Sequence, residues 1–588
     1  MFLNLSIKLK QKREKMSKRI AVLDKEVCTK EKCGYVCIKI CPVNRMGKEC
    51  IVIDENTSYP SISEDLCIGC GICVKKCPTN AITIINLTKD LGNPIFSYGK
   101  NAFRLHGLPL PKENVVVGFI GKNGIGKTTA IKLLSGQLKP NFGNEFKEEL
   151  MDELPIEQRN YLKSLKTIRL SVKPQNIEKL RSSKISVDEL LNELKIPHEI
   201  LNEFELEKIK SRKLNELSGG ELQKLSIAIA LSKKADIYYF DELTNFLDIK
   251  ERLKMAIKLK EFGKDNTTII VDHDLAILDY LVDYVYVFFG EEDVYGAVSS
   301  IKPARNGINE YLNGFLKAEN LKIRDFEIKF STYSELESSA EIVLRYPSLQ
   351  KTYPNFSLKV EGGEIKKGEI VGIAGGNALG KTTFIKMLAG VEKPDNTNIQ
   401  NFLTISYKKQ YLERTGRYVR EILKGGNEFI LRRGLQLFNI PNRLLEKKDT
   451  SLSGGQLQRI AVLYALSREA DIYLLDEPSA FLDIEQRLAL AELVKDVAET
   501  ENKIIFVVDH DITLLDRIAS RLIVFTGIPS MEGRASKPLL KKEGMNLFLK
   551  EMDITMRRDK DSKRPKINKK GSVVDRKQRE EGNYYAFE

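Results

Sequence analysis

The sequence predicts an α/β protein in which a small α+β domain precedes two copies of a nucleotide-binding domain. Three observations lead to this fold class. All nine cysteines of the 588-residue chain lie between Cys28 and Cys77. Two P-loops of the form G-x-x-x-x-G-K-[ST] follow, at Gly121–Thr128 and Gly375–Thr382. The same further motifs come after each P-loop, so the chain repeats itself from about residue 95 to residue 535.

The composition excludes some classes of protein. Hydrophobic residues make up 42% and charged residues 30%, which is ordinary for a soluble chain. No apolar run approaches the length of a membrane span. Met1–Met16 lacks the apolar core and cleavage site of a secretory signal, so we expect a cytoplasmic protein. In that compartment, clustered cysteines indicate metal ligation rather than disulfides.

The net charge of +13 is concentrated at the two ends of the chain. Lys537–Arg579 holds fifteen basic and six acidic residues, and Met1–Cys33 holds ten basic and four acidic residues. Solvated tails would explain either end alone. Because two similarly charged ends flank a nearly neutral middle, we favour contact with a polyanion, above all nucleic acid.

The cysteines form two runs that are typical of iron–sulfur ligation. Cys67-x2-Cys70-x2-Cys73-x3-Cys77-Pro78 has the spacing of the bacterial ferredoxin motif, and Cys28-x4-Cys33-x3-Cys37-x3-Cys41-Pro42 is a looser copy. In two-cluster ferredoxins the fourth cysteine of each run ligates the other cluster. We therefore predict two 4Fe–4S clusters, one held by Cys28, Cys33, Cys37 and Cys77, and the other by Cys41, Cys67, Cys70 and Cys73. Cys50 is left over as a free thiol in the intervening loop.

Two alternatives concern this cysteine region. A pair of zinc sites would need cysteine pairs with well-separated partners, and the close triple Cys67, Cys70 and Cys73 does not suit that. The clusters either transfer electrons or simply hold together a domain of about 60 residues, whose core is small. No flavin or haem motif lies nearby.

Each P-loop has the setting that phosphate binding requires. Apolar strands are expected at 115–120 and 370–374, and a helix begins directly after each loop. Backbone N–H groups of the loop and of the helix N-terminus cradle phosphates. The Lys reaches the β- and γ-phosphates, and the Thr hydroxyl holds Mg²⁺. The candidate ATP-binding residues here are Gly121, Asn123, Gly124, Gly126, Lys127, Thr128 and Thr129, and Gly375, Asn377, Gly380, Lys381, Thr382 and Thr383.

Three more motifs follow each P-loop in the same order. An LSGG sequence lies at Leu217–Gly220 and again at Leu452–Gly455. The pairs Asp241-Glu242 and Asp476-Glu477 end apolar strands, at the edge where ligands bind in α/β sheets. Two of only four histidines, His273 and His510, then occupy one repeated position. A core or surface histidine has no reason to repeat in this way, so we predict that both lie in catalytic sites.

These motifs, twice and in this order, resemble those of the ATP-binding cassette (ABC) ATPases. The resemblance implies that the two cassettes pair head to tail, with each ATP held by one P-loop and by the LSGG of the other cassette. Site one would combine Lys127 and Thr128 with Ser453 and Gly455, and site two would combine Lys381 and Thr382 with Ser218 and Gly220. ATP would then join the cassettes, and hydrolysis would release them.

The resemblance also implies roles for the remaining site residues. Mg²⁺ would be held by Thr128, Gln175 and, through water, Asp241 in site one, and by Thr382, Gln410 and Asp476 in site two. Glu242 and Glu477 would orient or deprotonate the attacking water, and His273 and His510 would contact the γ-phosphate. Adenine is expected to stack on an aromatic residue upstream of each P-loop, with Tyr98, Phe103 and Tyr353 as candidates.

Two departures distinguish the copies. Leu243 stands where the second copy has Pro478, and Ala378 replaces Gly124 of the first P-loop. We expect the two sites to differ in rate, in a direction that these residues do not reveal.

Two segments lie outside the ATP motifs. The first cassette carries an insertion at Asn144–Lys166, which predicts two short helices around the turn at Pro155. It is either a tolerated loop insertion or a docking element. A second repeat follows each cassette, with Gly307–Leu312 matching Gly544–Leu549. Each copy runs on to an Arg-Asp end, at Arg324 and Arg558. We interpret the two as paired hinges along the cassette junction, with basic residues facing outward.

This combination resembles one family, ABC subfamily E, also called the RNase L inhibitor family. The resemblance covers about residues 17–580 and implies a monomeric, cytoplasmic ATPase that recycles ribosomes without a membrane partner. Its expected partners are the small ribosomal subunit and a release factor or a rescue factor of the pelota type. The expected organisation is a basic extension (1–16), a ferredoxin-like iron–sulfur domain (17–90), cassette one (94–300), hinge one (301–330), cassette two (340–535), and basic hinge two with the C-terminal tail (536–588).

Two other classes of function fit less well. A soluble ATPase that energises a membrane transporter needs neither the hinges nor the iron–sulfur domain. A redox protein gated by ATP shares the clusters but needs a redox partner.

Overall fold

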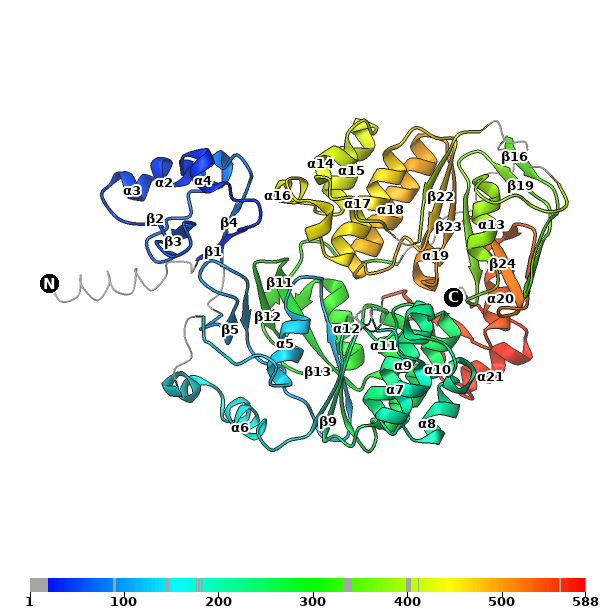
Figure 1. Cartoon of the computed structure of the whole chain (residues 1–588), viewed down its shortest axis with the longest axis horizontal. Coiled ribbons are helices and arrows are strands. Elements are labelled where there is room, and N and C mark those ends of the chain that lie inside the picture. The colour runs from blue at the N-terminus through cyan, green and yellow to red at the C-terminus, as the bar shows by residue number, and fades with distance from the viewer. Residues whose placement is uncertain are drawn as a thin grey trace.

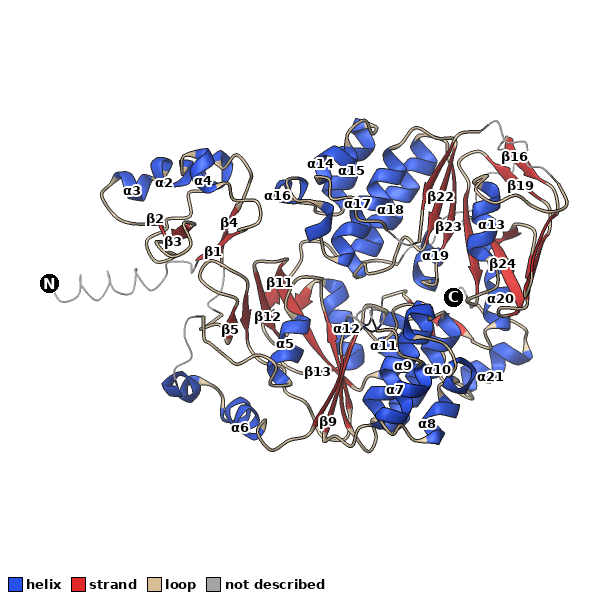
Figure 2. Ribbon diagram, in the orientation of Figure 1, coloured by secondary structure: helices blue, strands red, loops and turns tan. Residues whose placement is uncertain are grey.

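The computed structural model describes residues 19–586 except 88–90, 144–147, 176, 178–179, 181–182, 331–340, 398–402, 411 and 560–561. The predicted N-terminal extension lies outside the described residues. A small cysteine-rich domain is followed by two α/β domains that face each other (Figure 1). Helices lie beside the strands in each of these domains (Figure 2). Within the described part of the chain, no helix combines the length and apolar character needed to cross a membrane.

The cysteine-rich domain is an α+β unit. Its elements are β1 (Arg19–Leu23), η1 (Lys30–Cys33), α2 (Val36–Ile40), α3 (Pro42–Arg45), β2 (Ile51–Ile53), β3 (Pro60–Ile62), α4 (Ile72–Lys76) and β4 (Ile82–Asn86). β1 pairs antiparallel with β4, and β2 with β3. Ala21, Ile51 and Ile62 are buried among cysteine side chains, which make up much of this small core.

Cassette one is built on a nine-stranded sheet of order β5-β6-β12-β11-β7-β10-β9-β8, with β13 paired to β11. β7, β9 and β10 are buried along their whole length, as expected for parallel strands covered on both faces. The elements are β5 (Phe96–Ser97), β6 (Arg104–His106), β7 (Val116–Ile120), α5 (Lys127–Leu134), η2 (Glu148–Glu153), α6 (Ile156–Ser164), β8 (Leu170–Lys173), α7 (Val187–Glu193), α8 (His198–Glu203), η4 (Leu206–Ile209), η5 (Leu214–Glu216), α9 (Gly219–Ser232), β9 (Ile237–Asp241), α10 (Ile249–Phe262), β10 (Thr267–Val271), α11 (Leu275–Leu281), β11 (Tyr284–Glu291), β12 (Tyr295–Val298) and β13 (Lys302–Pro303).

Cassette two repeats this topology strand for strand, in the order β17-β18-β25-β24-β20-β23-β22-β21, with β26 paired to β24. A separate β16–β19 pair precedes the P-loop strand. The elements are β16 (Ile342–Tyr346), β17 (Leu349–Tyr353), β18 (Phe356–Val360), β19 (Gly363–Lys366), β20 (Ile370–Gly375), α13 (Lys381–Leu388), β21 (Ile405–Lys408), α14 (Val419–Leu423), α15 (Glu428–Leu437), α16 (Asn442–Leu445), η6 (Asp449–Ser451), α17 (Gly454–Ser467), β22 (Ile472–Asp476), α18 (Ile484–Thr500), β23 (Ile504–Val508), α19 (Ile512–Ile518), β24 (Arg521–Ile528), β25 (Glu532–Ala535) and β26 (Leu539–Leu540).

The insertion in cassette one forms two short helices, η2 and α6, on either side of Pro155, as predicted. Its residues 144–147 lie outside the described part. Tyr161 anchors α6 to the cassette, because its hydroxyl donates to the carbonyl of Leu134 at 2.8 Å. Ile156 is 72% exposed. The insertion therefore presents an apolar side chain outward, which suits the docking interpretation.

Each repeated hinge begins with a helix packed on its cassette. Hinge one contains α12 (Ala304–Asn313), β14 (Phe315–Leu316) and β15 (Leu321–Lys322), and hinge two contains α20 (Lys541–Glu551), β27 (Met556–Arg558), β28 (Pro565–Ile567) and α21 (Val573–Glu580). A Cβ atom at Gly307 would lie 2.2 Å from Val285 of β11, and one at Gly544 would lie 2.7 Å from Leu522 of β24. The repeated glycine is explained by this close approach of helix and strand.

The expectation that the basic residues of the hinges face outward is wrong for three arginines. Arg324, Arg558 and Arg564 are buried or nearly so, with side-chain exposures of 3%, 8% and 2%. Buried guanidinium groups need carboxylate partners, and each of the three has one. Exposed basic residues remain, among them Lys322 and Arg557.

The two hinges join the cassettes reciprocally. Arg324 of hinge one pairs with Glu485 of cassette two at 2.8 Å. Arg564 of hinge two pairs with Asp279 of cassette one at 3.0 Å and also donates to Asn309 of hinge one. Each hinge therefore holds the opposite cassette by a buried ion pair.

We predict that Asp279→Ala destabilises the chain by about 3 kcal/mol, because it leaves Arg564 buried without its carboxylate. Differential scanning calorimetry should show the first unfolding transition lowered by more than about 5 °C. The matched control is Glu428→Ala, which removes an exposed pair with Arg432 and should leave the transition unchanged. Equal effects of the two changes would contradict this interpretation of the junction.

Candidate functional site: two shared nucleotide sites and a cysteine domain

Site one is a pocket shared between the cassettes. Cassette one contributes its P-loop, the predicted Mg²⁺ ligands, the glutamate and the histidine, while cassette two contributes its LSGG and Phe481. The predicted residues that line this pocket are Tyr98, Phe103, Asn123, Gly124, Gly126, Lys127, Thr128, Thr129, Gln175, Asp241, Glu242, His273, Ser453 and Gly455.

Site two has the reciprocal composition. Its pocket is lined by Asn377, Gly380, Lys381, Thr382, Thr383, Gln410 and Glu477 of cassette two, and by Ser218, Gly220 and Phe246 of cassette one. His510 lies beside this pocket, because its Nε2 is 3.6 Å from Glu477 Oε1. Asp476 directly precedes Glu477 at the end of β22. The head-to-tail arrangement is confirmed.

Two aspartates outside the predicted set join the cassettes at these sites. The backbone N–H of Asn123 donates to Asp483 Oδ2 at 2.7 Å, and that of Asn377 donates to Asp248 Oδ2 at 2.9 Å. Burial raises the pKa of Asp248, but the N–H groups of Asn377 and Glu251 outweigh it and leave the pKa below its usual value. The junction thus stabilises the charged carboxylate of Asp248 against the P-loop of cassette two.

A buried lysine fixes the backbone of each Asp–Glu pair. Lys173 Nζ donates to the carbonyls of Asp241 at 2.8 Å and Glu242 at 3.0 Å, and Lys408 does the same for Asp476 and Glu477 at 2.8 and 3.1 Å. Glu242 and Glu477 have φ of 52° and 47°, a conformation that costs free energy outside glycine. The lysines therefore help to hold a strained turn.

A glutamine from each LSGG helix supports the same turn. Gln223 Nε2 donates to the carbonyl of Glu242 and Gln458 Nε2 to that of Glu477, both at 2.8 Å. These glutamines and lysines lie within or beside the repeated motifs, but no role was predicted for them. Their repetition in both copies was the signal that could have identified them.

The two glutamates have different surroundings. The carboxylate of Glu242 accepts hydrogen bonds from Gln175 and Asn245, whereas that of Glu477 accepts one from Gln410 and faces His510. Burial and the neighbouring Asp241 raise the pKa of Glu242 to about 7. Burial also pushes the pKa of Glu477 upward, but His510 and Lys381 outweigh it and bring the pKa to about 2. The equivalent of Asn245 is Ala480, a difference that sequence reasoning missed.

The carboxylates of Asp241 and Asp476 are the buried oxygens best placed for a metal ion. Asp241 is 2% exposed and Asp476 is fully buried. None of their carboxylate oxygens has a hydrogen-bond partner among the described residues. Burial raises the pKa of both, while the nearby lysines act in the opposite direction. Oxygen ligands without donors suit a hard divalent cation.

Aromatic residues flank each P-loop. The hydroxyls of Tyr98 and Thr129 lie 3.2 Å apart. A Cβ atom at Gly126, whose φ is +91°, would lie 2.8 Å from the ring of Phe103. In cassette two, Phe356 lies against Gly380 in the same way, 3.1 Å from a Cβ placed there. Tyr353 stacks on Phe356 with ring centroids 6.5 Å apart. Phe356 was missed because the aromatic spacing differs between the copies.

The fold brings the cysteines together in the two predicted groups. Cys28, Cys33, Cys37 and Cys77 line one enclosed pocket. Cys73 lies close enough to Cys67, Cys70 and Cys41 to interact with them electrostatically. Burial raises the pKa of Cys37 to about 12 and that of Cys73 to about 11. Ligation by iron would displace the thiol protons and compensate for this burial.

Backbone amides also point at the sulfurs, because Gly69 N–H donates to Cys67 Sγ at 3.4 Å and Ala81 N–H to Cys77 Sγ at 3.3 Å. Cys50 is 1% exposed and interacts electrostatically with Cys41 and Cys67. It is therefore a free thiol between α3 and β2, as predicted, and it is buried next to the second group.

The cysteine domain contacts both cassettes. Lys447 of cassette two pairs with Asp24 and Glu26 of the domain, each at 2.9 Å. Arg443 donates to Thr83 at 2.7 Å and to the carbonyl of Glu292 in cassette one. Asn101 of cassette one donates to the carbonyls of Ala21 and Ile62. Movement of one cassette relative to the other would therefore alter the contacts that hold the cysteine domain.

Known protein families match the chain over these same segments. The family model described as ABC transporter matches residues 111–245 and 358–480. The 4Fe-4S binding domain model matches residues 60–83, and a model described as a possible Fer4-like domain in RNase L inhibitor matches residues 19–49. The class of the protein is thus an ABC-type ATPase with twin cassettes and an iron–sulfur domain.

Relatives that match nearly the whole chain identify the family more specifically than the domain models do. An uncharacterised ABC transporter ATP-binding protein of Methanocaldococcus jannaschii is 43% identical over 96% of this chain and 97% of its own length. Translation initiation factor RLI1 of Saccharomyces cerevisiae is 39% identical, covering 96% and 98%. A chain from a model of ribosome-bound archaeal Pelota and ABCE1 superposes with a TM-score of 0.91 at 46% identity, covering 97% and 99%. The chain belongs to ABC subfamily E, the RNase L inhibitor family.

Proposed function

We propose that this chain recycles ribosomes. ATP binding closes the twin cassettes and moves the iron–sulfur domain, which splits ribosomes into subunits after termination or rescue. The protein then stays on the small subunit until hydrolysis reopens the cassettes and releases it. The observation that carries this proposal is the pair of shared sites, since residues of both cassettes line each pocket and the cysteine domain contacts both cassettes.

The relatives support the ribosomal part of the proposal. One similar structure is a model of ribosome-bound archaeal Pelota and ABCE1. Another, with a TM-score of 0.77 and 44% identity over 85% of this chain, is a complex of archaeal ribosomal stalk protein aP1 with archaeal ribosome recycling factor aABCE1. We propose the small ribosomal subunit and a release factor, or a rescue factor of the pelota type, as partners of this chain in the cytoplasm. The exposed basic residues of the hinges would meet ribosomal RNA.

The chemistry at each site follows from the residues assembled there. We assign Mg²⁺ to Thr128, Gln175 and, through water, Asp241 in site one and to Thr382, Gln410 and, through water, Asp476 in site two, where it would neutralise charge on the phosphates. Lys127 and Lys381 bind the β- and γ-phosphates, and Ser453 and Ser218 face the γ-phosphate from the opposite cassette. Glu242 and Glu477 position the attacking water, and His273 and His510 contact the γ-phosphate. The proposed domain bounds are those expected from the sequence.

The ribosomal proposal predicts ATP-dependent co-sedimentation with 30S subunits. The double variant Glu242→Gln/Glu477→Gln should bind ATP without hydrolysing it and should therefore accumulate on 30S subunits in a sucrose gradient. Glu428→Gln, a matched change on an exposed helix face, should behave like the unchanged chain. Absence of the double variant from the 30S fraction in the presence of ATP would refute the proposed function.

The cofactor proposal is two 4Fe–4S clusters, and it predicts about eight iron atoms per chain. Cys70→Ser and Cys28→Ser should each lose about four irons, because each removes a ligand of one cluster. Cys50→Ser is the matched control and should keep the full content. Zinc in place of iron, or the same loss in Cys50→Ser, would contradict the ligand assignment.

A further inference from the structure

Two arginines outside the nucleotide pockets occupy the same place in the two cassettes. Arg252 lies on α10 and Arg487 on α18, each four residues after the aspartate that caps its helix. Their side chains are only 11% and 14% exposed. Neither lines a nucleotide pocket, and neither has a role in the proposed function.

Each arginine binds two loops of its own cassette at once. Arg252 Nε donates to the carbonyl of Leu247 at 2.8 Å, and its Nη1 donates to Asp274 Oδ2 at 3.0 Å. In cassette two, Arg487 Nε donates to the carbonyl of Leu482 at 2.9 Å and Nη1 to Asp511 Oδ2 at 2.7 Å. The atoms correspond one for one. Only a guanidinium presents two donors in such a fixed fork.

The two loops belong to different nucleotide sites. Asp274 follows His273, which lines site one, and its other oxygen caps α11 through Ala276 and Ile277. Leu247 precedes Asp248, whose carboxylate holds the P-loop of site two. The hydrogen bonds of Arg252 therefore complete a continuous series of covalent and hydrogen-bonded contacts, which leads from His273 of site one to the P-loop of site two. Arg487 closes the mirror path from His510 of site two, through Asp483, to Asn123 of site one.

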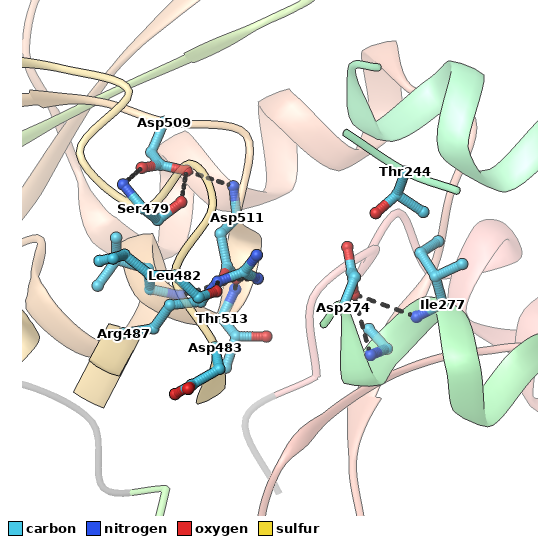
Figure 3. A network of polar contacts seen from close by, with 12 residues as sticks. Thr244, Asp274, Ile277, Ser479, Leu482, Asp483, Arg487, Asp509, Asp511 and Thr513 are labelled. Carbon is cyan, nitrogen blue, oxygen red and sulfur yellow. Dashed lines mark hydrogen bonds and ion pairs between the residues drawn. The ribbon is translucent and has the colours of Figure 1, made fainter. Parts of the chain in front are cut away.

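The cassette-two half of this arrangement is visible at close range in Figure 3, where Arg487 lies between Leu482 and Asp511 while Asp509 binds Ser479. Asp274 lies across the junction, with its carboxylate directed at the first turn of α11. Asp274, Arg487 and Asp511 line one cavity between the cassettes. The two paths thus approach each other at the centre of the junction.

We propose that Arg252 and Arg487 are positioning residues that couple the two ATP sites, each along its own path. A shift of His273 as it meets the γ-phosphate in site one moves Asp274. Arg252 carries that shift to Leu247 and Asp248, and so to the P-loop of site two. The reverse signal travels through Arg487. This coupling is a property of the ATPase itself and needs no ribosome.

The test uses the full chain with only one site able to hydrolyse ATP. In Glu242→Gln, hydrolysis comes from site two, and His273→Ala then alters a residue of the other site. We expect His273→Ala to change kcat at site two by at least about threefold, a coupling within the usual range for connected residues. Addition of Arg252→Lys, which keeps the charge but loses the fork, should abolish this response.

The mirror measurement is the internal control. In Glu477→Gln, hydrolysis comes from site one, and His510→Ala should change its kcat through Arg487. Arg252→Lys should leave that response intact, because Arg252 lies on the other path. Persistence of the first response in Arg252→Lys, or equal loss of both responses, would overturn the proposal, the latter by showing a merely structural role.

A second variant guards against a folding defect. Asp274→Asn can still accept the N–H groups of α11 but loses the charge that attracts Arg252, so it should abolish the response along the Arg252 path alone. Failure of the ribosomal proposal would leave these kinetics unchanged. Failure of the site assignment would show earlier, as full hydrolysis in the Glu242→Gln/Glu477→Gln chain.

Discussion

The structure depends on two hydrogen bonds that cross the cassette junction, from the backbone N–H of Asn123 to Asp483 and from that of Asn377 to Asp248. They fix each P-loop against the opposite cassette, within reach of its LSGG serine. Without that register neither pocket would contain both halves of a nucleotide site. A P-loop alone can bind phosphate. When each P-loop faces the LSGG of the opposite cassette, a bound ATP would lie in the interface and stabilise it.

The surrounding contacts serve this junction. Buried ion pairs from the hinges, Arg324 with Glu485 and Arg564 with Asp279, tie each hinge to the opposite cassette. The cysteine domain is held from cassette two by Lys447 and from cassette one by Asn101. Because these contacts involve both cassettes, a change in their separation reaches the domain directly. The two sites are not identical. The carboxylate of Glu242 accepts a hydrogen bond from Asn245, whereas cassette two has Ala480 at the equivalent position.

Much of this organisation could be predicted from the sequence, because it lies in local motifs. The P-loops, the Asp–Glu pairs and the two cysteine groups have spacings that the chemistry itself requires, and the repeat predicts that the two cassettes share one topology. The crossing of the cassettes came from family resemblance rather than from spacing. Buried cations were misjudged: Arg324 and Arg564 were predicted as surface charge because their partners Glu485 and Asp279 are 161 and 285 positions away. Lys173 and Arg252 were missed because their roles come from tertiary contacts, and Phe356 because the aromatic spacing differs between the copies.

The central claim, that each site is built from both cassettes, is tested most directly by Ser453→Arg. A bulky cation there should block the nucleotide bound by Lys127, although it lies in cassette two. Photolabelling with 8-azido-ATP, quantified by mass spectrometry of peptides near each P-loop, measures the two sites separately. The account predicts that Ser453→Arg reduces labelling of cassette-one peptides far more than that of cassette-two peptides, and that Ser218→Arg does the reverse. Loss of label only from the cassette that carries the substitution would contradict it.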